Sequence, residues 1–431
     1  MNYKETLEYL YKMAPMFQQM GSTAYKTGLE NTLSIASHTN NPHLLFHSIH
    51  VGGTNGKGSI SHILSSIFKQ SGYKTGLYTS PHLRNFRERV KIDGEMMPEQ
   101  FMVDFVAEHK LFFEKIQPSF FELTTAMAFQ YFAQEQVDIA IIEVGLGGRL
   151  DCTNIIKPDL CIISNISFDH TDILGNSIQE IAQEKAGIIK KETPIIIGES
   201  DPLSEAVFRR KAESENAPIR FADKENIIQS ALLNKEGQWI FENQTYPNLL
   251  GQLGGLVQQK NAASVLCAIE ELIKIGYKIS PYAVCEGFAK VVENTGLQGR
   301  WQQIGSKPRI IVDTAHNVGG LKYVVQQLQG YTYANLHIVF GMVNDKDISS
   351  VLDLLPKDAI YYFAKADIPR ALDHEQLRLQ AASFGLIGDS FSSVKAAVFA
   401  AKSKASKNDI IFVGGSTFVV ADFLELVSAP S

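Results

Sequence analysis

A glycine-rich segment, GGTNGKGS at residues 52–59, carries the clearest chemical pattern in the chain. An apolar run before it predicts a β-strand, and a helical pattern follows it. Glycines let the backbone turn tightly so that its N–H groups point at phosphate oxygens, while Lys57 and the helix N-terminus supply positive charge. The segment departs from the strict P-loop pattern, because residue 51 is valine and Gly58 separates Lys57 from the hydroxyl of Ser59. A plain glycine turn is the alternative, but the strand–loop–helix order and the lysine favour phosphate binding, and therefore a nucleotide.

Three further side chains lie where a cation could bind beside such phosphates. Glu143 ends a predicted strand and is followed by glycines, and α/β proteins bind ligands at the carboxyl ends of parallel strands. Its carboxylate suits a hard cation such as Mg²⁺, and a salt bridge with Arg149 is an equally good interpretation. His170 follows the next predicted strand; its imidazole would also suit Mn²⁺, although a lone histidine is more often structural. Ser80, before Pro81, offers a hydroxyl, but a surface turn is the better interpretation from the residues alone.

Composition excludes several classes of protein. The chain has 431 residues, 45% of them hydrophobic and 20% charged, so it is long enough for two to four domains with sizeable cores. A net charge of −6 argues against a general nucleic-acid binder. The N-terminus lacks the apolar stretch of a secretory signal, no apolar run approaches the roughly 18 residues of a membrane span, and the four cysteines form no CxxC pair. We therefore expect a cytoplasmic protein without nucleic-acid or membrane partners, and with free thiols rather than disulfides or a zinc site.

Short β-branched runs alternate with helical patterns, which predicts an α/β fold whose parallel strands are buried on both faces. The polar, glycine-containing stretch 293–305 predicts the boundary between a P-loop-containing parallel-sheet domain, 1–295, and a smaller Rossmann-like domain, 296–431. A small β meander or an irregular insertion is expected within 221–250. Strands are predicted at 47–51, 138–144, 160–164, 194–197, 309–313, 336–340, 359–363 and 409–413. Helices are predicted at 57–70, 98–115, 123–134, 177–189, 258–275, 281–292, 319–328, 348–354, 374–382, 394–403 and 417–426.

A series of motifs runs in order from residue 52 to residue 420, over almost the whole chain. They are GGTNGKGS, GLYTSPHL with ERV, SFFELTTAMAF, EVGLGGRLDCTN, SFDHTDILG, IAQEKAGIIK, QKNAA, DTAHN, NDKD, PRAL and GGSTFVV. With them the chain resembles the folylpolyglutamate synthase and dihydrofolate synthase family, within the wider Mur ligase group. GGTNGKGS and DTAHN would suit the wider group, whereas TSPHL, EVGLGGRLD and EKAGIIK are much more specific to the folate branch.

This resemblance implies an enzyme of folate biosynthesis that uses ATP and one or two Mg²⁺ ions to join L-glutamate to dihydropteroate and to folates through an acyl phosphate. The implied ATP contacts are Thr54, Asn55, Gly56, Lys57, Gly58, Ser59, Asn261, Arg300 and Asp313. The implied metal ligands are Ser80, Glu143 and His170, and the implied pterin–benzoate contacts are Phe121, Glu122, Leu150 and Asp151, with 24–27 closing over them. The implied catalytic residues are Lys57, Lys185 and His316.

Lys185 matches the position that carries a CO₂-derived carbamate in this family, whereas its place in a helix predicts an ordinary surface charge. The same resemblance implies an ATP-binding central domain with a folate site at 1–295 and a glutamate-ligase domain at 296–431. A monovalent cation and a monomeric state are implied as well. The chain departs from the family pattern at Val257, at Gln298 before Gly299-Arg300, and at Val318, positions that concern adenine contact and hinge geometry.

Four interpretations of the function remain open at this point. The first is a bifunctional ligase for dihydropteroate and reduced folates, and the second performs only the polyglutamate step. A Mur-type peptidoglycan ligase is a weaker alternative, because only about 50 residues precede the glycine-rich segment and a nucleotide-sugar domain would need more. A non-enzymatic ATP-binding switch is weaker still, since it would not need candidate cation ligands at two further strand ends.

Overall fold

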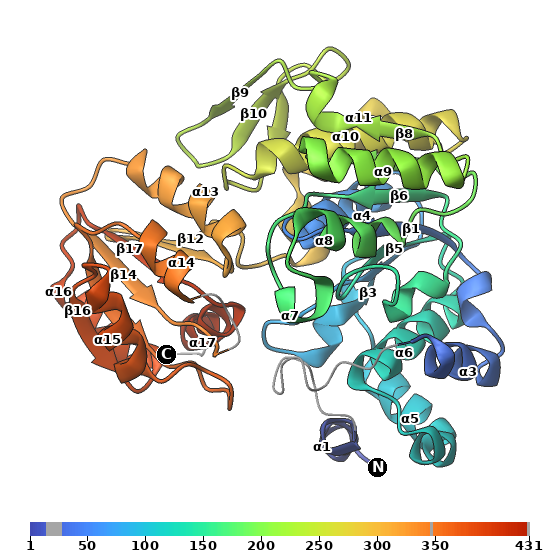
Figure 1. Cartoon of the computed structure of the whole chain (residues 1–431), viewed down its shortest axis with the longest axis horizontal. Coiled ribbons are helices and arrows are strands. Elements are labelled where there is room, and N and C mark those ends of the chain that lie inside the picture. The colour runs from blue at the N-terminus through green and yellow to red at the C-terminus, as the bar shows by residue number, and fades with distance from the viewer. Residues whose placement is uncertain (14–27, 345–347, 429–431) are drawn as a thin grey trace. The chain divides into compact units, whose positions relative to one another are not determined.

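A computed structural model describes residues 1–13, 28–344 and 348–428 of the chain (Figure 1). The contacts divide these residues into two compact units. The first holds residues up to 252 together with 258–297, and the second holds 253–257 together with 298 onward. Each unit is built around its own sheet, and the predicted α/β class is confirmed.

The first unit contains an eight-stranded sheet in the order β4-β3-β2-β5-β1-β6-β7-β8. Six of its strands are parallel: β1 (His47–Gly52), β2 (Thr75–Tyr78), β5 (Ile139–Glu143), β6 (Leu160–Ile163), β7 (Ile195–Ile197) and β8 (Ile219–Phe221). Strands β3 (Val90–Ile92) and β4 (Glu95–Met96) extend one edge in antiparallel fashion. Strand β1 lies between β5 and β6, so the segment after β1 is flanked by the carboxyl ends of both neighbours.

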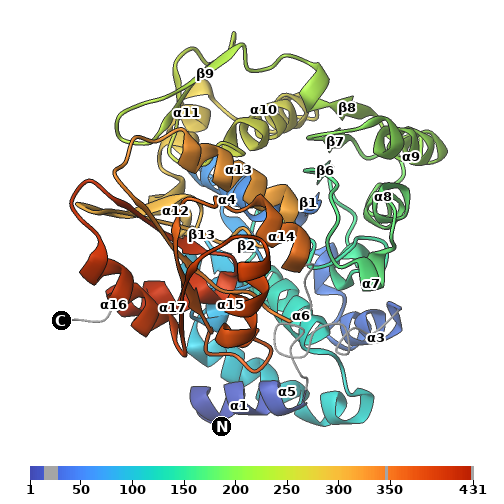
Figure 2. The same cartoon turned by 60° about the vertical axis from the view of Figure 1, so that its left-hand side comes forward.

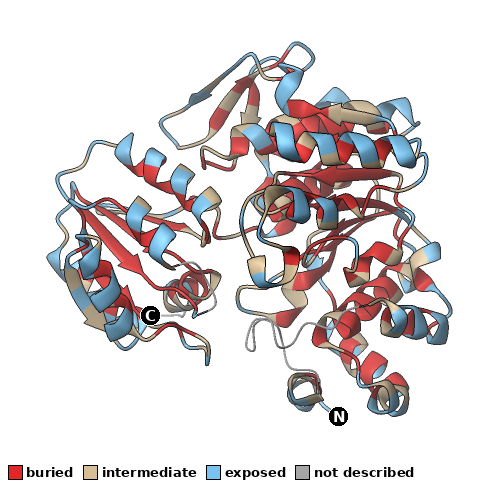
Figure 3. Cartoon of the chain, viewed as in Figure 1, coloured by how far each residue is buried: buried red, intermediate tan, exposed pale blue. Residues whose placement is uncertain are grey.

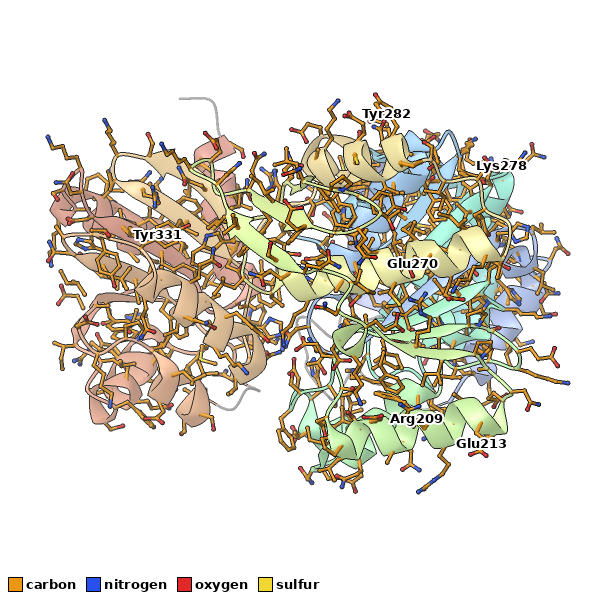
Figure 4. The ribbon with its side chains drawn as sticks, turned by 90° about the horizontal axis from the view of Figure 1, so that it is seen from above. Arg209, Glu213, Glu270, Lys278, Tyr282 and Tyr331 are labelled. Atoms are coloured by element: carbon orange, nitrogen blue, oxygen red, sulfur yellow. The ribbon has the colours of Figure 1, made fainter. Side chains whose placement is uncertain are left out.

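Helices cover both faces of this sheet, which explains why its strands are continuous apolar runs. One face packs against α5 (Glu99–Ile116), α6 (Phe120–Gln134), α8 (Ile178–Ala186) and α9 (Pro202–Ser214). The other carries α4 (Lys57–Gln70), α10 (Gln258–Lys274) and α11 (Pro281–Ala289). Figure 4 labels Arg209 and Glu213 on α9 and Glu270 on α10, on opposite sides of the strands, and Figure 2 shows α8 and α9 beside β6 to β8. Helix α4 is buried along most of its length. The central strands β5, β1 and β6 of the sheet are largely buried as well (Figure 3).

Short elements complete the first unit. They are α1 (Tyr3–Met13), α3 (Glu30–His38), α7 (Thr171–Leu174), α12 (Val291–Thr295) and the 3₁₀ turns η2 (Pro42–Leu44), η3 (Phe86–Arg89), η4 (Cys152–Ile155) and η5 (Ala222–Lys224). Within the stretch expected to be a meander or an irregular insertion, β9 (Ser230–Leu233), β10 (Trp239–Glu242) and β11 (Leu249–Gly251) form an antiparallel three-stranded sheet.

The second unit contains a six-stranded sheet in the order β12-β13-β17-β14-β15-β16. Its strands are β12 (Gln302–Ser306), β13 (Arg309–Asp313), β14 (Leu336–Phe340), β15 (Ile360–Ala364), β16 (Gly388–Phe391) and β17 (Ile410–Gly414), and only β12 is antiparallel. Its helices are α13 (Val318–Gln329), α14 (Ile348–Leu354), α15 (His374–Ser383), α16 (Val394–Lys404) and α17 (Thr417–Ser428). Strand β12 lies in the stretch expected to be a linker.

Segment 253–257 belongs to this second unit although it precedes α10 in the chain. The Gln327 carboxamide of α13 holds it, accepting a hydrogen bond from Leu256 N at 2.7 Å and donating one to Gly254 O at 2.8 Å. The chain therefore passes between the units three times, after Gln252, after Val257 and after Leu297.

The four cysteines are free thiols, as expected. None of the helices in the described residues has the length and apolar character to cross a membrane.

Candidate functional site

The glycine-rich segment forms a tight loop from β1 into α4. Gly53 has φ 129° and Gly56, which caps α4, has φ 88°, a backbone region that favours glycine. A Cβ on Gly53 would overlap the Ser164 hydroxyl. The Lys57 ammonium lies back over the loop and donates to the carbonyls of Gly53 and Thr54, each at 3.1 Å. The loop thus combines a helix N-terminus with a lysine, which is the arrangement that binds phosphate groups.

The segment after β6 holds this loop in place through hydrogen bonds. Asn165 accepts the Thr54 N–H on its carbonyl and the Asn55 N–H on its side chain, at 2.9 and 3.0 Å. Thr54 Oγ1 lies 3.1 Å from Ser167 N, and Ser164 Oγ donates to Asn55 O at 2.5 Å. Asn165 and Ser167, which hold the loop through these bonds, were not among the residues expected at the site from the sequence. Their place at the end of a strand beside β1 was the signal that could have found them.

Helix α10 closes the other side of the loop. Gln258 Nε2 donates to Ser59 Oγ at 3.2 Å, and Asn261 Nδ2 donates to Gln258 Oε1 at 2.9 Å. A side chain on Gly56 would overlap the Asn261 carboxamide, so Asn261 lies directly against the loop. The structure therefore brings Asn261 together with the residues of 54–59.

Two of the three candidate metal ligands, Ser80 and Glu143, share a hydrogen bond. Glu143 ends β5, is 4% exposed, and accepts a hydrogen bond from the Ser80 N–H at 3.2 Å. Arg149, considered as an alternative partner for Glu143, forms an ion pair with Glu184 at 2.8 Å. The His170 ring lies 3.8 Å from the Asp169 carboxylate. Within residues 1–13, 28–344 and 348–428, no three His, Cys, Asp or Glu side chains gather closely enough to hold a metal by themselves.

Lys185 is buried against the glycine-rich loop and is not the surface charge that its helix position predicts. It is 4% exposed, and its Nζ donates to Gly53 O at 2.9 Å. Gly53 O therefore accepts from both Lys57 and Lys185. Burial, with the nearby charge of Lys57, lowers the Lys185 pKa to about 7, although Asp169 and Asp151 act in the opposite direction. A larger share of the Lys185 amine is consequently neutral and nucleophilic near pH 7 than of an ordinary lysine.

The residues assigned to the pterin–benzoate region surround the loop after β5. The Phe121 ring packs on Gly145, where any side chain would overlap it. Glu122 accepts the Ser119 N–H at 2.5 Å in a capping box at the start of α6. Leu150 is half-buried and Asp151 is buried. Segment 24–27 lies outside the described residues.

The candidate residues of the second unit gather at the carboxyl end of β13. Asp313 accepts the Trp301 N–H at 2.7 Å and the Ala315 N–H at 2.8 Å; burial raises its pKa, and Arg300 opposes that shift. The Arg300 guanidinium donates to Thr314 Oγ1. His316 Nδ1 lies 3.1 Å from the Thr314 carbonyl, which can only accept, so Nδ1 is the donor of this hydrogen bond.

Comparisons with known proteins identify the family of both parts of the chain. The Mur ligase middle domain matches residues 51–269, and the Mur ligase glutamate ligase domain matches 299–417. The dihydrofolate synthase/folylpolyglutamate synthase of Escherichia coli is 35% identical over 88% of this chain and 86% of its own. A probable bifunctional folylpolyglutamate synthase/dihydropteroate synthase of Haloferax volcanii is 30% identical over 98% of this chain, which spans half of that relative's length.

Solved structures agree with the fold over almost the full length. Escherichia coli FolC in complex with DHPP and ADP has a TM-score of 0.85 at 32% identity, covering 100% of this chain and 98% of that one. The bifunctional folylpolyglutamate synthase/dihydrofolate synthase of Yersinia pestis, in complex with AMPPNP and Mn ion, has a TM-score of 0.83 at 29% identity, covering 99% and 98%. The chain therefore belongs to the folylpolyglutamate synthase family of Mur ligases, a family of ATP-dependent ligases.

Proposed function

We propose that the chain is a bifunctional dihydrofolate synthase/folylpolyglutamate synthase, which joins L-glutamate to dihydropteroate and to tetrahydrofolates with ATP. The observation that carries this proposal is the placement of Lys57, Lys185 and Glu143 around one loop after β1, in a chain whose relative of known structure binds ADP and DHPP. Cytoplasmic location, a monomeric state and a monovalent-cation requirement are further parts of the proposal.

The chemistry explains why this enzyme needs such a site. A carboxylate does not react with an amine at neutral pH, because oxide would have to leave. Transfer of the ATP γ-phosphoryl group to the carboxylate forms an acyl phosphate with a good leaving group, and the glutamate nitrogen then attacks the acyl carbon and releases phosphate. Carboxylate and γ-phosphate are both anionic, so the Lys57 ammonium and the loop N–H groups must offset their repulsion.

The residues present fit a divalent cation that is held together with ATP. Mg²⁺ usually takes one or two carboxylates and completes its oxygen shell with phosphates and water. Glu143 supplies a buried carboxylate beside Ser80, so these two residues would hold the ion, with His170 as a third proposed ligand. When bound, the ion would neutralise charge on the phosphoryl group in transfer.

A carbamate on Lys185 fits the charges around it. The neutral amine attacks the carbon of CO₂, a C–N bond forms while one C=O bond becomes C–O⁻, and the nitrogen releases a proton. The product is an anion close to Lys57, where the unmodified ammonium would be repelled. Modification therefore replaces the repulsion from Lys57 by an attraction. The carboxylates of Asp169 and Asp151 would repel the carbamate, and the proposed cation near it would offset that repulsion.

We expect carbamate formation on Lys185 to rise steeply between pH 6 and pH 8. With a pKa of about 7, the neutral fraction of the amine increases from about one tenth to about nine tenths over this range, while an ordinary lysine stays below about 1% neutral. The carbamate signal in ¹³C NMR, recorded at fixed dissolved ¹³CO₂, measures this change. Lys185→Arg should abolish the pH-dependent signal, and its persistence in that variant would contradict the assignment.

The test of the proposed function is ADP release from Mg·ATP with L-glutamate, comparing dihydropteroate with tetrahydrofolate as the acceptor. Turnover with both acceptors supports the bifunctional enzyme. Turnover with tetrahydrofolate alone reduces the function to polyglutamate synthesis. Turnover with neither would refute the proposal and favour the two alternatives, a Mur-type ligase and an ATP-binding switch.

A further inference from the structure

A buried chain of hydrogen bonds links β1 to the loop that follows β5. His50 lies two residues before Gly52, on the face of the sheet that Ile142 and Cys161 share, and it is fully buried. Its Nε2 lies 2.8 Å from Thr153 Oγ1. The same Thr153 hydroxyl lies 2.5 Å from Asp151 Oδ1, and the Thr153 N–H donates to that oxygen at 3.0 Å.

The donor and the acceptor can be assigned for each hydrogen bond between His50, Thr153 and Asp151. Burial raises the pKa of Asp151, but the Thr153 hydroxyl and the N–H groups of Leu146, Thr153 and Gly145 oppose this shift by donating to the carboxylate. The Thr153 hydroxyl therefore donates to Asp151 and accepts from His50.

His50 Nδ1 is buried and has no hydrogen-bond partner among the residues that the structure describes. A proton on Nδ1 would leave a buried N–H unpaired, which costs more than an unpaired acceptor, so the proton lies on Nε2. Burial, with the nearby charge of Lys190, lowers the His50 pKa to about 3, which keeps the ring neutral.

Asp151 uses its carboxylate to shape its own loop. Oδ1 accepts both Thr153 donors, and Oδ2 accepts the Leu146 N–H at 2.8 Å, so the carboxylate ties the two ends of loop 146–151 together. A carboxylate has about four acceptor positions, and these bonds occupy most of them.

This loop separates two parts of the proposed site. On one side Gly145, the residue just before the loop, lies against the Phe121 ring. On the other side, Arg149 N donates to Glu184 O at 2.8 Å, and a side chain on Gly148 would lie 3.0 Å from Lys185 O. A shift of the loop would consequently move the surface next to Phe121 and the packing of the helix that carries Lys185.

We propose that His50 is a positioning residue for the acceptor site: through Thr153 it holds Asp151, and with it the loop that packs on Phe121. The proposal rests on the proposed function, because that function makes the surface beside Phe121 a folate or pteroate site. His50 is distinct from the residues that surround the phosphates, since its bonds lead away from the glycine-rich loop toward η4.

The 3₁₀ turn η4 has other anchors, so loss of His50 should loosen the loop without unfolding the unit. Asn154 Nδ2 donates to Arg149 O at 3.0 Å and to Gly187 O at 3.1 Å, and Lys190 Nζ donates to Asn154 O at 2.8 Å. Substitution of His50 should therefore mainly change the positions of the Thr153 hydroxyl and the Asp151 carboxylate.

The test compares His50→Leu, Thr153→Val and the double variant with His50→Gln, whose side-chain amide can replace the Nε2 donor. His62→Leu is the matched control, because His62 is also a buried histidine bonded to a threonine hydroxyl, Thr295 Oγ1 at 2.7 Å, and this bond leads to α12 instead of η4. Amide hydrogen exchange at 145–151 in the ligand-free protein reports loop position. The KM for the acceptor, set against the KM for ATP and kcat, reports the consequence for the reaction.

We expect His50→Leu and Thr153→Val each to speed exchange at 145–151 and to raise the acceptor KM by about ten-fold, the factor that one buried hydrogen bond is worth. The double variant should be no worse than either single one, His50→Gln should recover most of the loss, and His62→Leu should leave both values unchanged. Unchanged exchange in His50→Leu, additive effects in the double variant, or equal rises in both KM values would overturn the proposal. Should wild type show no acceptor-dependent ADP release, the proposed function fails, whereas the exchange data still decide whether His50 holds the loop.

Discussion

Replacing Lys57 by alanine should lower kcat/KM for acceptor-dependent ADP release by about 10²- to 10³-fold, the loss typical of a group that stabilises charge in the transition state. Lys57 is the first residue of α4, and its ammonium is fixed over the loop by the carbonyls of Gly53 and Thr54. An ammonium has three donors, so a phosphate oxygen can take the third. Steady-state kinetics with saturating magnesium measures the change.

The control is Lys69→Ala, which removes the same side chain from the last turn of the same helix. Lys69 Nζ donates to Asp93 O at 2.7 Å, away from the glycine-rich loop. This variant should retain turnover within about two-fold. Its lysine does not contact the glycine-rich loop through this bond, and substitutions away from a site usually have small effects. If Lys57→Ala turned over like Lys69→Ala, the role assigned to Lys57 would be wrong.

The sequence could predict those parts of the site that lie at the ends of strands. Parallel strands buried on both faces are continuous apolar runs, and glycines or polar residues mark where they stop. The loop at 52–59 and the position of Glu143 at the end of β5 were therefore predictable. Strand β12 was not, since QQIGS is a polar edge strand without alternation, and it formed only because it pairs with β13.

The parts that could not be predicted depend on contacts between distant segments. Asn165 bonds to Asn55 across 110 positions, and Lys185 bonds to Gly53 across 132. Nothing in the local pattern of α8 distinguishes a buried lysine from a surface one, because helical periodicity specifies a face of the helix and not what covers it. The resemblance to a known family named Lys185, and only the structure supplies a physical reason, a low pKa caused by burial beside Lys57.

Alanine at position 185 should reduce acceptor-dependent ADP release by about 10²- to 10³-fold, and formate or acetate should restore part of the activity. The substitution removes the amine that would carry the carbamate and leaves a space beside Gly53 O. A short carboxylate that enters this space supplies the same negative charge near Lys57 that the carbamate would supply. The dependence of the rate on formate concentration measures the rescue.

Lys185→Met distinguishes the loss of the carbamate's negative charge from the loss of side-chain packing, because the methionine side chain fills the space that alanine leaves open. It should be as inactive as Lys185→Ala but insensitive to formate. Its free energy of unfolding at pH 7 should be equal to or higher than that of wild type. The lowered pKa means that folding disfavours the charged amine, so the native lysine costs stability at every pH below its ordinary pKa. Equal rescue of both variants would show that formate acts elsewhere, and wild-type turnover in either would remove Lys185 from the mechanism.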